Sequence, residues 1–159
     1  MQLNLFRFII FILIIAIVQQ IVNNSTSLYI DCIGLVLVAL LITNTESHIR
    51  FIIILSIFAD LIGHWYCGTH LLAITLLSFI SKYAIDFYKI CNNLQKAIIS
   101  GIFYAILLLI IGLIDIITHN NNFSWFNFVF EIFIVNPIIL WLFHSFIIRV
   151  PSYIFRMDN

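Results

Sequence analysis

Charged residues are scarce in this chain: Asp, Glu, Lys and Arg make up 9% of its 159 residues, whereas 64% are hydrophobic. A soluble domain of ordinary composition carries about 25% charged residues. Mean hydropathy is correspondingly high, at +1.17. This composition excludes an ordinary soluble domain and indicates an integral membrane protein. The formal net charge is zero and no long basic run is present, so nucleic-acid binding is not expected.

Recognisable catalytic motifs are also missing. The sequence contains no G-x-S-x-G nucleophile elbow, no Walker loop and no H-E-x-x-H zinc motif. Apolar runs occupy most of the chain, which leaves little length for a soluble catalytic domain on either side of a membrane. We therefore expect a single transmembrane domain over residues 1–159 that is not an enzyme and uses no cofactor.

The apolar residues fall into six runs, which predict an all-α bundle of about six transmembrane helices with short loops. The runs are Phe8–Val22, Leu28–Thr43, Phe51–Ile62, Leu71–Ala84, Ala97–Thr118 and Phe126–Ile148. The second and third are shorter than the roughly 20 residues that span hydrocarbon. They either recruit the flanking segment Thr45–Ile49 or form a partial hairpin covered by other helices. Gln19, Gln20 and Asn23 stand where a signal peptide would be cleaved, so the first run is read as an uncleaved helix.

If each run crosses the membrane once, all Lys and Arg residues lie on the same side of it: Arg7, Arg50, Lys82, Lys89, Lys96, Arg149 and Arg156. The breaks that contain none are Asn23–Tyr29, Gly63–His70 and His119–Trp125. Alternation of basic and non-basic loops is the positive-inside pattern of multi-pass membrane proteins. It predicts an even number of crossings, with both termini in the cytoplasm.

Four acidic residues are expected in or near the outer half of the membrane: Asp31, Asp60, Asp115 and Glu131. No Lys or Arg is there to pair with them, but three histidines are: His64, His70 and His119. Because burying an ionisable group in a membrane is costly, these acids are candidates for a proton or cation relay.

The alternative for these acids is structural. Asp31 and Asp115 would reach water near helix ends, and Asp60 would cap the turn that follows it. Glu131, about two helical turns inside the last run, is the candidate for a specific buried role. If Asp60 is a cap, Asp60→Asn should be milder than Asp60→Ala, because an amide oxygen still accepts a hydrogen bond.

The break after the third run contains residues that could form a metal site or a disulfide. His64, Cys67 and His70 form an H-x2-C-x2-H string, with His119 expected nearby. This spacing is not a common zinc pattern, so ordinary polar turn residues are the preferred interpretation and no metal is expected. Only Cys32 and Cys67 share the outer side, which allows at most one disulfide; free thiols are preferred.

Asn136-Pro137 interrupts the last run near its middle. Proline removes a backbone hydrogen bond and kinks a helix. In a membrane the freed carbonyl must find another donor. We therefore expect Asn136 and Asn127 to face other helices rather than lipid.

The order of these features resembles the rod shape-determining membrane protein family MreD. The most specific similarity is the stretch Asp60–Ala73. There an Asp-Leu pair ends one helix, a turn containing Gly68 follows, and Leu72-Ala73 opens the next helix, although the turn is bulkier than the family's. A second similarity is the proline-containing last crossing, Asn136–Trp141, with its basic end at Arg149.

The resemblance implies a non-enzymatic scaffold in the bacterial inner membrane that supports cell shape and lateral peptidoglycan synthesis. It implies an MreC-like bitopic partner, together with the actin-like filament protein and the elongation glycosyltransferase–transpeptidase pair. It also implies a helix arrangement similar to the substrate-binding subunits of vitamin transporters. On this reading Asp60, Gly68, Asp115, Glu131, Asn136 and Pro137 are structural or interaction residues.

Two other classes of protein remain open. A small transporter or transporter subunit would use Asp60, Asp115 and Glu131 around an outward-facing cavity. An intramembrane enzyme of lipid chemistry ranks last, because the acids lack a basic clamp for a phosphate group.

Overall fold

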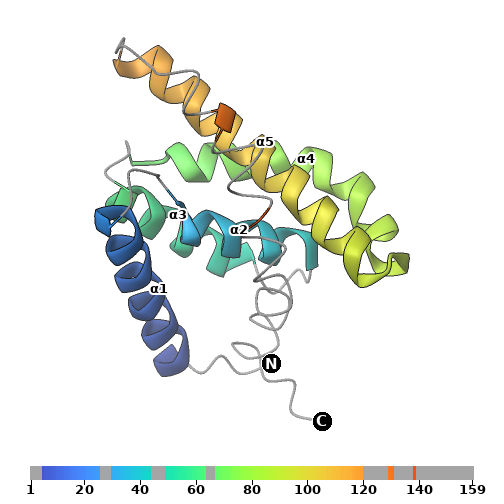
Figure 1. Cartoon of the computed structure of the whole chain (residues 1–159), viewed down its shortest axis with the longest axis horizontal. Coiled ribbons are helices and arrows are strands. Elements are labelled where there is room, and N and C mark those ends of the chain that lie inside the picture. The colour runs from blue at the N-terminus through green and yellow to red at the C-terminus, as the bar shows by residue number, and fades with distance from the viewer. Residues whose placement is uncertain are drawn as a thin grey trace.

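The computed structural model describes residues 5–25, 30–43, 49–63, 67–119, 129–130 and 138. Within these residues all regular structure is helical, in five helices and no strand (Figure 1). The helices are α1 (Leu5–Ser25), α2 (Cys32–Thr43), α3 (Ile49–Gly63), α4 (Thr69–Ile90) and α5 (Asn93–His119). The expected all-α fold is confirmed for this part of the chain. Of the sixth apolar run only Val129, Phe130 and Ile138 are described; Glu131, Asn136 and Pro137 lie outside the described residues.

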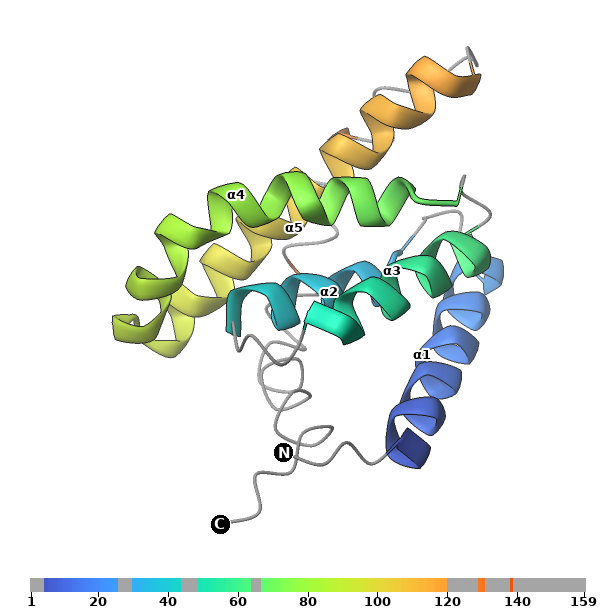
Figure 2. The same cartoon turned by 180° about the vertical axis from the view of Figure 1, so that it is seen from behind.

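Helices α2 to α5 alternate in direction. Helix α1 is steeply inclined to them and contacts them at its C-terminal end (Figures 1 and 2). As a result, the end of α1, the start of α2, the end of α3 and the start of α4 come together at one place. We call this place the junction.

Helix α2 lies in the middle of the bundle and packs against each of the other four helices. Its residues from Leu35 to Ile42 are all buried. A helix covered on every side needs no polar face, which explains why this segment is apolar throughout. The second apolar run was expected to be short, and the helix has only 12 residues.

Two described helices, Thr69–Ile90 and Leu94–Thr118, are long and apolar enough to cross a membrane. The apolar segments Ile9–Ser25, Cys32–Ile42 and Phe51–Gly63 are shorter. By length and composition, the described residues therefore support two crossings. The count of six remains a prediction.

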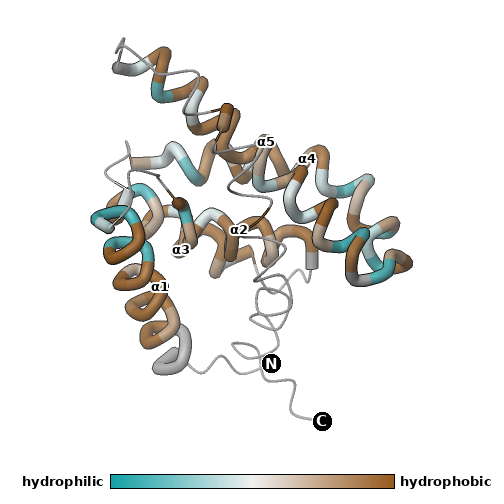
Figure 3. Tube along the Cα trace, in the orientation of Figure 1, coloured by the Kyte–Doolittle hydropathy of each residue, from teal (hydrophilic) through white to brown (hydrophobic). Residues whose placement is uncertain are grey.

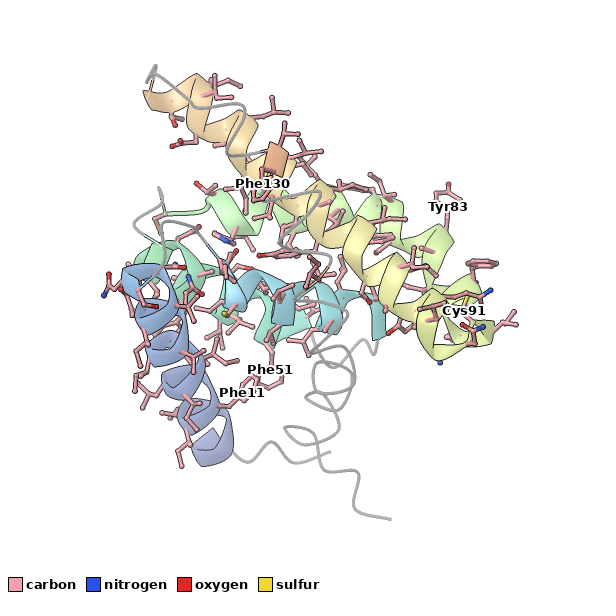
Figure 4. The ribbon with its side chains drawn as sticks, viewed as in Figure 1. Phe11, Phe51, Tyr83, Cys91 and Phe130 are labelled. Carbon is pink, nitrogen blue, oxygen red and sulfur yellow. The ribbon has the colours of Figure 1, made fainter. Side chains whose placement is uncertain are left out.

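Apolar side chains also cover the outside of the bundle, as the hydropathy colouring in Figure 3 shows. On α4, Phe79 and Phe87 are 71% and 63% exposed, and Tyr83 points away from the bundle (Figure 4). Soluble monomers rarely expose apolar surface on this scale. Polar residues gather instead at the C-terminal end of α1 and around the α4–α5 turn (Figure 3). This distribution is typical of helices that contact lipid along their length.

The α4–α5 turn is closed by a reciprocal pair of hydrogen bonds. The backbone N–H of Gln95 donates to Asn92 Oδ1 at 2.9 Å, and the N–H of Asn92 donates to Gln95 Oε1 at 3.0 Å. This is a capping box, which satisfies backbone donors that the first turn of a helix leaves unpaired. It fixes the start of α5 and thereby the α4–α5 hairpin.

We expect Asn92→Ala to lower the free energy of unfolding by about 1 kcal/mol, because the N-cap acceptor of α5 is lost. Denaturant unfolding of the full chain in detergent micelles, followed by far-UV circular dichroism, measures the change. Lys89→Ala is the matched control: its ion pair with Asp86 is exposed, and exposed pairs contribute little. Equal effects of the two substitutions would contradict the capping argument.

Candidate functional site

A buried cluster of two aspartates and one histidine occupies the junction. His70 Nδ1 lies 2.7 Å from Asp60 Oδ1, and His70 Nε2 lies 2.8 Å from Asp31 Oδ2. Asp31 directly precedes α2, Asp60 lies in the last turn of α3, and His70 is the second residue of α4. The imidazole therefore connects three helices, and none of the three residues is more than 1% exposed.

Asp60 caps the N-terminus of α4 from the neighbouring helix α3. Its Oδ2 accepts the backbone N–H of Gly68 at 2.6 Å, and its Oδ1 accepts the N–H of His70 at 2.9 Å. Gly68 itself, the N-cap residue of α4, offers no side-chain acceptor. The carboxylate supplies what is missing and lies where the helix dipole favours negative charge. The expected role of Asp60 as the cap of the following turn is confirmed.

Gly68 permits this arrangement through its backbone conformation. Its φ is +101°, in the region where a side chain with a Cβ atom is strained. With Gly68 in this conformation, both Gly68 and His70 direct their N–H groups to Asp60.

Asp31 performs the same capping role for its own helix, α2. Its Oδ1 accepts the N–H of Gly34 at 2.8 Å, while its other oxygen contacts His70. The hydroxyl of Tyr104, on α5, donates to the Asp31 carbonyl oxygen at 3.0 Å. The expectation that Asp31 reaches water near a helix end is wrong: groups from α2, α4 and α5 hold it inside, at 1% exposure.

Gly34 is the position that lets Asp31 fold back over the first turn of α2. A Cβ atom built on Gly34 would overlap Asp31 Oδ2 and lie 2.8 Å from its Cγ. Any larger residue at this position would displace the carboxylate from His70. Gly34 is not among the site residues expected from the sequence.

The C-terminal end of α1 satisfies further backbone groups at the junction. Gln19 Oε1 accepts the N–H of Ile33 at 3.2 Å, and Asn23 Oδ1 accepts the N–H of Ile30 at 2.9 Å. Gln20 Nε2 donates to the carbonyl oxygen of Ile62, at the end of α3. Gln19 and Asn23 are four residues apart and so share one face of α1, which is the pattern that could have identified them.

The geometry limits the chemistry available to His70. Both ring nitrogens are engaged by carboxylates, so neither is available to activate a nucleophile or to bind a metal ion. Among the described residues no group of three metal-binding side chains is arranged to hold an ion. His64 lies outside the described residues, and the three cysteines are free, with Cys67 exposed. Of the expected free, membrane-buried thiols, only Cys91 is buried, and Cys32 is partly buried.

Asp115 is not part of the cluster. Asp115 is half-buried on the last turns of α5, which project beyond the junction (Figures 1 and 2). Glu131 lies outside the described residues. Of the acids proposed from the sequence, the structure brings together Asp31 and Asp60.

Comparison with protein-family models, curated proteins and solved structures finds no match to this chain.

The two aspartates should differ in their response to conversion to asparagine. Both oxygens of Asp60 face a backbone N–H, so the amide NH₂ of Asp60→Asn must oppose a donor whichever way it turns. In Asp31→Asn the oxygen can keep the Gly34 N–H while the NH₂ donates to His70 Nε2. An unsatisfied buried donor costs about 1–3 kcal/mol.

We therefore expect Asp60→Ala to be the most destabilising substitution, Asp60→Asn the next and Asp31→Asn the mildest, by unfolding in detergent micelles. The full chain with each single substitution is compared at one pH. A loss of stability in Asp31→Asn as large as that in Asp60→Asn would contradict the assigned hydrogen bonds.

Proposed function

We propose that this chain is a multi-pass scaffold protein of the bacterial inner membrane that acts in cell elongation through helix-mediated binding of an MreC-like bitopic partner. The proposal is based on the burial of the aspartate–histidine cluster at the junction. Asp31, Asp60 and His70 are at most 1% exposed, and both aspartates are hydrogen-bonded to His70, which holds the helix ends together. A substrate or ion would have to break those bonds to enter.

The positions of the basic residues support a membrane orientation. Arg7 and Arg50 lie at the starts of α1 and α3, while Lys89 and Lys96 flank the α4–α5 turn. These are the helix ends opposite to the junction (Figures 1 and 2). Under the positive-inside rule the basic ends lie in the cytoplasm and the junction lies toward the outer face.

The resemblance to MreD supplies the particular role, and its most specific stretch coincides with the turn that Asp60 caps. Asp60 and Gly68, two positions of that stretch, meet through a 2.6 Å hydrogen bond. A transporter built on Asp60, Asp115 and Glu131 needs water access to Asp60, whose two oxygens are instead occupied by backbone donors. The scaffold is therefore favoured over the transporter.

The orientation predicts the outcome of reporter fusions. Fusions after residues 26, 66, 91, 122 and 159 should report outside, outside, inside, outside and inside, because every basic segment is retained in the cytoplasm. Alkaline phosphatase and green fluorescent protein fusions to the same positions provide opposite readouts. A cytoplasmic signal after residue 66 would show that α2 and α3 do not form a complete hairpin.

The proposed role predicts that depletion rounds and widens rod-shaped cells, and that a bitopic MreC-like protein co-purifies with the chain in detergent. The association should survive high salt, because the outer surface of the helices is apolar and screening acts on exposed charges. Cell dimensions and pull-down at low and high salt measure the two effects. Substrate-dependent uptake by proteoliposomes that contain only this chain would favour the transporter instead.

A further inference from the structure

The histidine at the junction is placed between two carboxylates, one on each ring nitrogen. The separations of 2.7 Å and 2.8 Å are hydrogen-bond distances at both ends. Each such contact needs one hydrogen between nitrogen and oxygen. The cluster therefore needs two hydrogens along its Asp60–His70–Asp31 axis.

A neutral imidazole carries only one ring hydrogen, and an ionised carboxylate carries none. With both aspartates ionised, one ring nitrogen would direct its lone pair at a carboxylate oxygen, which is repulsive. The missing hydrogen is supplied either by an imidazolium or by one protonated carboxyl group. Both arrangements contain one proton more than a neutral imidazole with two carboxylates.

Among the described residues, the other groups around the cluster do not place a hydrogen on this axis, and the thiol of Cys32, next to Asp31, is uncharged. The Asp60 oxygens receive backbone N–H groups from Gly68 and His70, and Asp31 Oδ1 receives that of Gly34. From α1 the nearest polar contribution is the uncharged Gln19, and from α5 it is Tyr104, whose hydroxyl hydrogen goes to the Asp31 carbonyl. On α4 the neighbours Thr69 and Ala73 are uncharged. No Lys or Arg among the described side chains pairs with the cluster.

We propose that the Asp31–His70–Asp60 cluster is a proton-binding site in which one bound proton joins α2, α3 and α4, so that loss of this proton above neutral pH loosens the junction. The proposal rests on the geometry of the cluster and holds whether or not the chain acts as a scaffold. The ligand is a single hydrogen ion, and the site is closed to larger species by the burial of all three side chains.

The sign of the pH dependence follows from the proton count. An unfolded chain releases its histidine proton above about pH 6.5, whereas the native cluster keeps one. The native state then binds more protons than the unfolded state, so stability falls as pH rises. Between about pH 5.5 and 6.5 the unfolded histidine is still half protonated or more, so stability changes little.

The first test is unfolding of the full chain in lipid nanodiscs or detergent micelles between pH 5.5 and 9. For the wild type, the unfolding equilibrium constant should rise above pH 6.5 by up to about tenfold per pH unit. In Asp31→Asn the amide can donate to His70 Nε2, so a neutral imidazole is satisfied and this rise should be largely lost. Asp86→Asn removes an exposed acid from α4 and should keep the wild-type slope.

The three proteins share the other four histidines, so the difference between them isolates the cluster. A wild-type slope that Asp31→Asn retains unchanged would overturn the proposal, as would a flat wild-type profile. A slope lost equally in Asp86→Asn would show that general surface charge, and not the cluster, causes it.

A second measurement uses the wild-type chain alone and is independent of how well variants fold. Nuclear magnetic resonance of ¹⁵N-histidine and ¹³C-aspartate at pH 7.5 should show His70 with both ring nitrogens protonated, or one cluster carboxyl carbon at the shift of a neutral acid. His70→Gln identifies the His70 signals by their disappearance. A neutral His70 ring together with two ionised cluster carboxylates would overturn the proposal.

Discussion

The two hydrogen bonds between His70 and the side chains of Asp31 and Asp60 are the constraint on which the rest of the bundle depends. They connect positions 39 and 10 residues away from the histidine. The surrounding helices are apolar on most of their surface, and in lipid apolar contact alone distinguishes poorly between alternative packings. Directional bonds between specific atoms can fix the relative rotation and depth of α2, α3 and α4 where apolar contacts leave several choices.

The short helix α2 illustrates how this constraint shapes its neighbours. With 12 residues it cannot reach across a bilayer unaided. Its N-terminal backbone donors would be unsatisfied if they were buried, yet Gly34 donates to Asp31 and Ile33 donates to Gln19. Because its start is satisfied by its own cap and by α1, the helix can begin inside the protein, and the four surrounding helices cover its apolar surface.

Much of the fold could be predicted from the sequence, since long apolar runs specify helices directly. The third run, Phe51–Ile62, matches α3 at Ile49–Gly63 within two residues. The fourth run ended at Ala84, whereas α4 continues to Ile90. The apolar run stops where polar residues begin. The helix continues past that point, and Asp86 and Lys89 pair one turn apart on its exposed face.

The site was only partly predictable for a different reason. Asp31, Asp60 and His70 were each identified as ionisable groups in the outer half, and the cap role of Asp60 follows from its position beside a turn. Their assembly depends on which helix ends meet, which is a property of the whole bundle. Gly34 and Tyr104 could not be identified from the sequence, because glycine and tyrosine are common in apolar helices. Both matter only through their contacts with Asp31.

The cluster is better understood as a device for specificity than as a source of stability. Burying charged groups costs several kcal/mol per ion, and their mutual attraction often only offsets that cost. Removing one partner is different, because it leaves a buried charge uncompensated at about 3–5 kcal/mol. Any packing that separates α2, α3 and α4 at the junction incurs this second cost, and more severely in a membrane where no water can replace the lost partner. The two aspartates and the histidine thus destabilise alternative helix packings more than they stabilise the native bundle. Because apolar helices can pack in several ways, this difference in free energy selects the native packing.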